Sequence, residues 1–148
     1  MSDSFDDFAI NLQNQIYEDT RKEYGQVFFD RWRNPLYMGR MEEADGYGRI
    51  TGTCGDTMEI FLRFEKNAVE EALFLTDGCG SSGVCGSFAA EIARGKDPDE
   101  LMEMNEEQIL EILGGLPEDD RHCAFLAVET LHKALNNYMT NQLKNSKD

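Results

Sequence analysis

The sequence predicts an α+β fold in which a three-stranded antiparallel sheet packs against several helices, preceded by an N-terminal helical extension. Two observations carry this prediction. Apolar residues follow the two-residue period of strands between residues 47 and 76, and they follow the longer period of helices before and after that stretch. Three strands with one apolar face require helices to cover that face. With 148 residues, of which 41% are hydrophobic, the chain suffices for one domain with a buried core.

A long helix is predicted over residues 4–32, because apolar residues recur there at helical spacing and Ser4 can cap its start. Asn34-Pro35 ends it, since the residue before a proline avoids helical geometry. An amphipathic helix of this kind usually faces a core, and a helix that binds a partner is the minority alternative. We assign residues 1–23 as an acidic amphipathic extension, residues 24–140 as a single domain, and residues 141–148 as a polar tail that frays.

A short strand before Cys54 and two longer strands after it form the predicted sheet. The midpoint between Cys54 and Cys79 falls at Lys66-Asn67, where the pattern requires a turn. If the two longer strands pair as an antiparallel hairpin around this turn, Asp56 lies opposite Asp77 and the two thiols approach each other. Two cysteines and a carboxylate would then meet at one edge of the sheet.

The second half of the chain contains four helix signals, each followed by apolar residues at helical spacing. They are Ser81 or Ser82 as a cap with Arg94-Gly95 at the far end, Asp97 with Glu100, Asn105 with Gln108, and the stretch after Pro117. The resulting helices supply the cover that the apolar face of the sheet needs.

Composition excludes several classes of partner. The net charge of −15 argues against nucleic acid and anionic membranes, because both bind basic patches. No apolar run is long enough to span a bilayer, and the start MSDSFDDFAI lacks the features of a signal or transit peptide. We therefore expect no nucleic-acid or membrane partner and a cytoplasmic location.

Four cysteines in a chain that is not exported are more often metal ligands or reactive thiols than disulfides. Their spacing contains no CxxC pair, so a zinc-ribbon or thioredoxin motif is excluded. Cys79 precedes a predicted helix whose free N–H groups and dipole stabilise a thiolate. Cys85 shares a face with apolar residues of that helix, which favours a buried structural thiol over a further ligand or redox partner.

The candidate site combines Cys54, Asp56, Cys79, His122 and Cys123. Because adjacent residues on a helix point about 100° apart, His122 and Cys123 can reach one ligand only from the first turn of the last helix. Three thiols with an imidazole and a carboxylate suit tetrahedral zinc or an iron–sulfur cluster. The carboxylate is the harder and more labile ligand, which favours a site that releases its cargo. His132, in mid-helix, is more typical of a surface or satisfied side chain.

Three segments of the chain resemble the signature segments of the IscU/NifU N-terminal family of iron–sulfur scaffolds, in the same order and with matching separations. They are Thr53-Cys54-Gly55-Asp56, Gly78-Cys79-Gly80-Ser81, and Leu116-Pro117 followed by His122-Cys123, with Tyr24 and Asn34-Pro35 matching the start of the family. The resemblance covers residues 24–135 and implies the IscU/SufE-like fold, a three-stranded antiparallel sheet with helices packed on it.

The resemblance also implies a function: to receive sulfur from a cysteine desulfurase and Fe²⁺ from a donor, to build a [2Fe-2S] cluster, and to pass it to apo-proteins, without enzymatic turnover. Cys54, Asp56, Cys79, His122 and Cys123 correspond to the cluster or metal ligands. Cys123 would accept the persulfide, and Asp56 would keep the cluster transferable. Residues 1–22 extend beyond the usual start of the family, and we expect them to cover a surface or to help two copies form a homodimer.

Where relatives carry Leu-Pro-Pro-Val-Lys, this chain has Leu116-Pro117-Glu118-Asp119-Asp120, which argues against interaction with an Hsp70-type chaperone. The three acidic residues should also raise the pKa of Cys123. Two alternatives to the scaffold remain open. A zinc-binding sulfur relay would use the same ligands to hold Zn²⁺, whereas a thiol enzyme with His122 as the base for Cys123 leaves Cys54 and Asp56 without a role.

Overall fold

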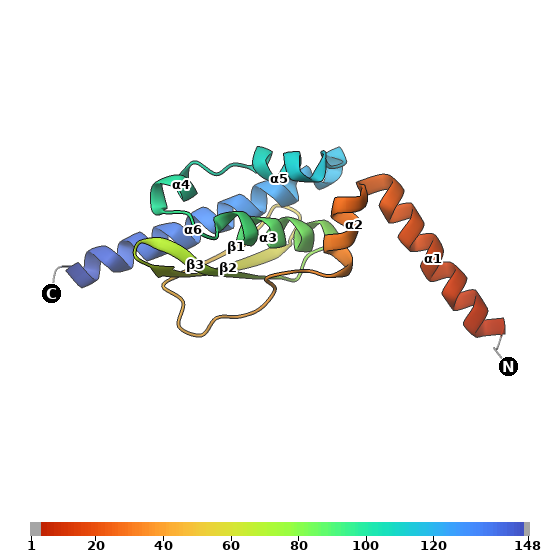
Figure 1. Ribbon diagram of the computed structural model, residues 1–148, viewed down its shortest axis with the longest axis horizontal. Helices are drawn as coiled ribbons and strands as arrows, with labels where there is room; N and C mark the ends of the chain where they lie inside the picture. Colours follow the sequence, from red (N-terminus) through yellow and green to blue (C-terminus); the bar gives the residue numbers. More distant parts are fainter. Residues whose placement is uncertain (1–3, 147–148) are drawn as a thin grey trace.

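The computed structural model describes residues 4–146, and it confirms a three-stranded antiparallel sheet with helices packed on it (Figure 1). In chain order the elements are α1 (Ser4–Tyr24), α2 (Gln26–Arg33), β1 (Gly46–Thr51), β2 (Thr57–Glu65), β3 (Ala68–Thr76), α3 (Gly80–Ala93), α4 (Pro98–Met102), α5 (Glu106–Leu113), the short 3₁₀ helix η1 (Glu118–Asp120) and α6 (Arg121–Ser146). Within this part of the chain, no helix combines the length and apolarity that a membrane span requires.

The strands lie in the order β1-β2-β3, and the two helices α3 and α6 cover one face of the sheet. The core forms between them from fully buried side chains that include Ile60 and Leu62 on β2, Phe74 on β3 and Leu131 on α6. Helix α6 crosses β1 so closely that a Cβ on Gly48 would lie 2.6 Å from the carbonyl oxygen of Thr130. The apolar pattern of the sequence therefore predicted both the sheet and its cover correctly.

The predicted helix over residues 4–32 is two helices. Gly25 adopts a φ of +91°, a conformation that favours glycine, and the chain changes direction there. Helix α2 buries Phe28 and Phe29, but α1 buries none of its residues and extends away from the domain (Figure 1). The expectation of a core-facing helix is thus wrong for α1, because helical spacing of apolar residues does not reveal whether a neighbouring surface covers them.

The β2–β3 hairpin turns at Lys66-Asn67 as predicted, with both residues at positive φ. Its register differs from the symmetric one, because a bulge between Arg63 and Phe64 shifts the pairing by one residue. Past the bulge, Thr57 rather than Asp56 faces Asp77: the Asp77 N–H donates to the Thr57 carbonyl at 3.2 Å, and the Thr57 N–H donates to Asp77 Oδ1 at 2.7 Å. The predicted pairing of Asp56 with Asp77 is therefore wrong.

The helix caps agree with the sequence in most places. Asp97 and Asn105 each form a capping box, and Gly114 ends α5 in the left-handed conformation. Two details differ. Cys79, not Ser81 or Ser82, is the N-cap of α3, which places both serines inside its first turn. Of the tail that was expected to fray, residues 141–146 continue α6, and residues 147–148 lie outside the described part of the chain.

Candidate metal centre

Three segments converge at one end of the sheet. The β1–β2 loop carries Cys54 and Asp56, the turn before α3 carries Cys79, and the start of α6 carries His122 and Cys123. The first loop is held tightly, because the Gly52 N–H donates to the Asp56 carbonyl at 2.7 Å and Gly55 takes a φ of +91°. Only the fold brings these segments together, since they are far apart in sequence.

The side chains of these segments form two overlapping groups in which one ligand atom per residue lies within 4.8 Å of the others. One group is Cys54, Asp56 and His122, and the other is Asp56, Cys79 and Cys123. The Sγ of Cys54 lies 3.1 Å from His122 Nε2, which is 3.6 Å from Cys123 Sγ, and the sulfurs of Cys79 and Cys123 are 3.9 Å apart. Asp56 is the common member, so the structure brings together all five residues that the sequence singled out.

Exposure differs between the thiols. Cys54 and Cys79 are exposed, whereas Cys123 is buried. Burial raises the pKa of Cys123 to about 12; a hydrogen bond from Ser82 lowers it, and the nearby Cys79 and Asp120 raise it further. The raised pKa of Cys123 agrees with the sequence-based prediction, but the main cause differs. The prediction attributed it to the acidic residues before His122. Of these only Asp120 contributes, and its effect is smaller than that of burial.

Ser82 belongs to the same cluster, although the sequence suggested for it only a capping role. Its side chain is fully buried, and its Oγ donates to Asp56 Oδ2 at 3.0 Å and lies 3.4 Å from Cys123 Sγ. Because residues three apart on a helix lie on neighbouring positions of one face, the spacing from Cys79 could have indicated that Ser82 approaches the site.

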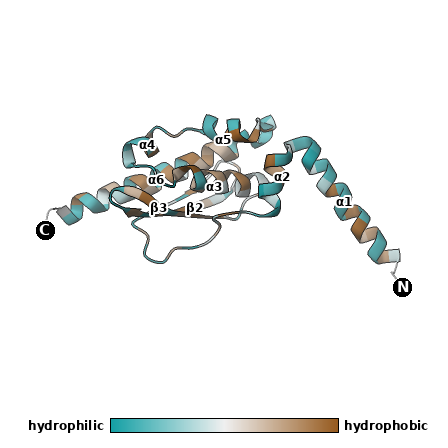
Figure 2. Cartoon of the chain, in the orientation of Figure 1, coloured by the Kyte–Doolittle hydropathy of each residue, from teal (hydrophilic) through white to brown (hydrophobic). Residues whose placement is uncertain are grey.

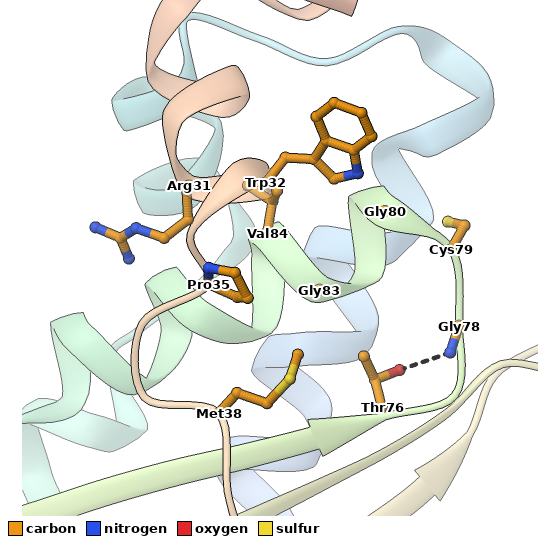
Figure 3. Close-up of a pocket in the computed structure, with 10 residues that line it drawn as sticks. All are labelled: Arg31, Trp32, Pro35, Met38, Thr76, Gly78, Cys79, Gly80, Gly83 and Val84. Atoms are coloured by element: carbon orange, nitrogen blue, oxygen red, sulfur yellow. Dashed lines mark hydrogen bonds between the residues drawn. The ribbon is translucent and has the colours of Figure 1, made fainter. Parts of the chain in front are cut away.

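A pocket of about 180 Å³ opens beside Cys79 (Figure 3). The indole of Trp32 lies over the first turn of α3, where a Cβ on Gly80 would come within 2.8 Å of Trp32 Nε1, and Pro35 and Met38 line the opposite part of the pocket. The Gly78 N–H donates to the hydroxyl of Thr76 at 3.0 Å, which fixes the turn that presents Cys79. One side of the ligand cluster thus adjoins a largely apolar hollow.

Tyr24 connects the end of α1 to the segment that precedes His122 and Cys123 on α6. Its hydroxyl donates to Asp120 Oδ2 at 2.6 Å, and its ring stacks on Phe28 with centroids 4.2 Å apart. The hydrogen bond to Asp120 raises the pKa of Tyr24 to about 12, and burial and the negative charge of Asp120 add to this effect. The start of α6 is therefore held from outside the ligand cluster as well.

The two remaining candidates lie outside both ligand groups. Cys85 is fully buried in the core, and burial raises its pKa well above the ordinary value. His132 is hydrogen-bonded through Nε2 to the Leu101 carbonyl at 3.0 Å. Both positions agree with the structural roles favoured by the sequence.

Comparison with protein families identifies residues 23–145 as a match to the NifU-like N terminal domain. The chain belongs to this family. It is similar to the iron–sulfur cluster assembly scaffold protein IscU 1 of Archaeoglobus fulgidus, with 36% identity covering 78% of this chain and 76% of the relative. It also resembles the scaffold protein IscU of Aquifex aeolicus, with 35% identity covering 81% of this chain and 78% of that protein.

Solved structures confirm the fold of this NifU-like chain. The N-terminal part of a NifU-like protein from Brucella abortus superposes with a TM-score of 0.65 at 17% identity, covering 81% of this chain and 96% of the other. The family and fold expected from the three cysteine-containing segments are therefore confirmed. The role of each of the five residues as a ligand stays a prediction.

Proposed function

We propose that this protein is an iron–sulfur cluster assembly scaffold that builds a [2Fe-2S] cluster and transfers it to apo-proteins. The convergence of Cys54, Asp56, Cys79, His122 and Cys123 at one accessible end of the sheet carries the proposal. Thiolates and imidazole are suited to iron–sulfur clusters and to zinc. The names of the curated relatives, which are scaffolds, favour this function over a zinc-binding sulfur relay.

The five ligand candidates exceed the four that one metal ion with tetrahedral coordination needs. Asp56 lies in both ligand groups, so a metal bound by either group can use its carboxylate. We propose that Asp56 exchanges readily, because a carboxylate is a harder ligand than a thiolate for iron in a sulfur-rich site. Zn²⁺ is expected to compete with Fe²⁺ for the same residues.

Cys123 is proposed to accept sulfur. Its sulfur attacks the outer sulfur of a persulfide on the donor; a new S–S bond forms at Cys123, and the S–S bond of the donor breaks. Because Cys123 is mainly a thiol, its proton passes to the donor cysteine, which leaves as a thiol. Because Cys123 is buried and exposed Cys79 lies beside it, the donor must approach past Cys79 or open the site. The protein carries the sulfur and has no turnover of its own.

The scaffold function requires a sulfur donor and acceptor proteins. We propose a cysteine desulfurase as the donor and apo iron–sulfur proteins as the acceptors, both reaching the exposed edge formed by Cys54 and Cys79. The acidic residues before His122 form η1, and the inference that they do not recruit an Hsp70-type chaperone stays a prediction. The cytoplasmic location also stays a prediction.

We also propose that residues 1–23 form an extension through which two copies associate, and that residues 24–140 form the scaffold domain; residues 1–3 lie outside the described part of the chain. On α1, Phe8, Leu12 and Ile16 are 64%, 51% and 48% exposed and lie on one side of the helix, as their spacing of four requires. Figure 2 shows hydrophobic residues along this helix, away from the domain. Residues 8–17 contain no charged side chain, so two copies of this acidic chain can meet there without opposing carboxylates.

Anaerobic reconstitution with Fe²⁺ and sulfide tests the scaffold proposal. We expect visible absorption from a bound cluster, and transfer of that cluster to an apo-ferredoxin. A matched variant with Cys54, Cys79 and Cys123 all replaced by serine should bind none. The proposal fails if the wild-type protein retains tightly bound zinc that iron cannot displace.

A further inference from the structure

Ser82 lies between proposed ligands from two different segments. Its Oγ is 3.0 Å from Asp56 Oδ2 on the β1–β2 loop and 3.4 Å from Cys123 Sγ on α6. The Sγ of Cys79 is 3.8 Å from the same oxygen. A fully buried hydroxyl thus contacts every member of the group formed by Asp56, Cys79 and Cys123.

A serine hydroxyl has one proton and rotates about its C–O bond, so it donates to one acceptor at a time. In the metal-free site, the carboxylate of Asp56 is the better acceptor, because it is charged and closer than the Cys123 sulfur. A metal that binds Asp56 through Oδ2 competes for the oxygen that accepts this hydrogen bond. The hydroxyl can then turn to the sulfur of Cys123, for which it is already within reach.

We propose that Ser82 is a positioning residue of the metal centre: its hydroxyl holds Asp56 in place in the metal-free protein and donates to Cys123 once Asp56 binds metal. The inference rests on the ligand set proposed above. Through these two hydrogen bonds, Ser82 couples the Asp56 carboxylate to the buried thiol of Cys123. Residues that hydrogen-bond to metal ligands orient them, and their loss typically lowers metal affinity by about 10–100-fold.

The same helix offers a matched control. Ser87 is also fully buried on α3, but its hydroxyl donates to the Leu36 carbonyl at 2.7 Å and accepts from Arg31 Nη1 at 2.9 Å. These contacts lie outside both ligand groups. Ser87→Ala therefore removes a buried hydroxyl and its hydrogen bonds from the same helix while leaving the ligand cluster intact.

The test uses anaerobic titration of the full chain with Co²⁺, whose thiolate-to-cobalt absorption reports on the sulfur ligands. We expect Ser82→Ala to weaken Co²⁺ binding by about tenfold and to move the thiolate-to-cobalt band to longer wavelength, because the Cys123 thiolate loses a donor. Ser87→Ala should leave both unchanged. Circular dichroism of the metal-free variants confirms that each is folded.

A double-mutant cycle separates positioning from a general structural role. In an Asp56→Ala background, Ser82→Ala should lower Co²⁺ affinity by clearly less than it does in the wild-type background, because no carboxylate is left for the hydroxyl to hold. It should still move the thiolate-to-cobalt band, because the hydroxyl can still donate to Cys123 in this background. Additive losses, or a band that does not move, would overturn the role of Ser82. If the wild-type protein gives no thiolate-to-cobalt band at all, the ligand set itself is wrong, and the proposed function fails with it.

Discussion

Gly78 lies directly against the carboxylate of Asp56: a Cβ at this glycine would come within 2.7 Å of Asp56 Oδ2 and of Ser82 Oγ. This contact results from the one-residue bulge in the β2–β3 hairpin, which turns Asp77 toward Thr57 and leaves Asp56 beside the turn that carries Cys79. The absence of a side chain at position 78 is therefore a requirement of the ligand cluster. Glycine here allows the close approach and is not needed for a special φ.

The first prediction follows from this contact. Gly78→Ala should displace Asp56 or Ser82, destabilise the fold by about 1–3 kcal/mol through overpacking, and weaken Co²⁺ binding by about tenfold through loss of ligand orientation. The control is Gly83→Ala on α3, where a Cβ would meet nothing within 4 Å. It should stabilise the helix by about 0.5–1 kcal/mol and leave Co²⁺ affinity unchanged. Urea unfolding and Co²⁺ titration measure both effects, and equal behaviour of the two variants would contradict the steric argument.

The second prediction concerns cluster release. Asp56→Ala should slow transfer of a reconstituted cluster to apo-ferredoxin, because the site then loses its most exchangeable ligand. Asp77→Ala is the control: this carboxylate is nearby in sequence to Cys79, but its Oδ1 accepts from the Thr57 N–H. The transfer rate of Asp77→Ala should match that of the wild type. Faster cluster loss from Asp56→Ala would show that the carboxylate stabilises the cluster instead.

Part of the fold and of the candidate site could be predicted from the sequence, and the rest could not, for identifiable physical reasons. The turn at Lys66-Asn67 and the apolar alternation located the sheet, and the cysteine-containing segments located the residues that converge at the candidate site. The bulge left only a small signal: the buried residues Val69 and Ala72 on β3 are three apart, with Glu70-Glu71 between them, and this single break in the two-residue period is easily overlooked. As a result the sequence placed Asp56 opposite the wrong residue. Ser82 was missed for a different reason: it was considered only as a helix cap, and its spacing from Cys79 was not used.

The orientation of α1 was unpredictable for a different reason. The apolar pattern continues across Gly25, so the sequence suggested one helix, and a glycine inside a helical pattern does not by itself indicate a break. Whether the apolar side of a helix is covered depends on where the adjoining turn directs it, and for α1 that is the turn at Gly25. Tertiary placement therefore decided the exposure of Leu12 and Ile16, and the periodicity did not.

The third prediction concerns the reactivity of the metal-free thiols. Cys54 and Cys79 should be alkylated rapidly by iodoacetamide, whereas Cys85 and Cys123 should be protected because they are buried. With its pKa raised to about 12, Cys123 has a thiolate fraction of only about 10⁻⁴ at pH 8, and its modification should accelerate as the pH rises. Mass spectrometry of native protein in a chelator gives the order of modification. Denatured protein, in which all four thiols are accessible, is the control; rapid native labelling of Cys123 would contradict its burial.

The fourth prediction uses the hydrogen bond from Tyr24 to Asp120. The pKa of Tyr24 is raised to about 12 in the folded state from 10.0, so the bond stabilises the fold below about pH 10 and this contribution disappears as the pH rises toward 12. Tyr24→Phe should lower the free energy of unfolding at pH 8 by about 0.5–1.5 kcal/mol. The difference from wild type should shrink above pH 10. In an Asp120→Asn background the pH dependence of this difference should weaken, because the negative charge is removed; an unchanged dependence would mean that Asp120 is not its cause.

The fifth prediction tests association through α1. If Phe8, Leu12 and Ile16 form the contact between two copies, sedimentation equilibrium should show a monomer–dimer equilibrium that Leu12→Ser shifts to monomer.

Ile10→Ser is a matched control on the same helix: Ile10 is 55% exposed, but at about 100° per residue it lies on the opposite side from Phe8. Tyr17, whose ring lies 5.7 Å from that of Phe29 and 6.0 Å from that of Trp32, anchors α1 to α2 in both variants. A wild-type chain that stays monomeric at high concentration, or equal effects of the two substitutions, would rule out this side of α1 as the interface.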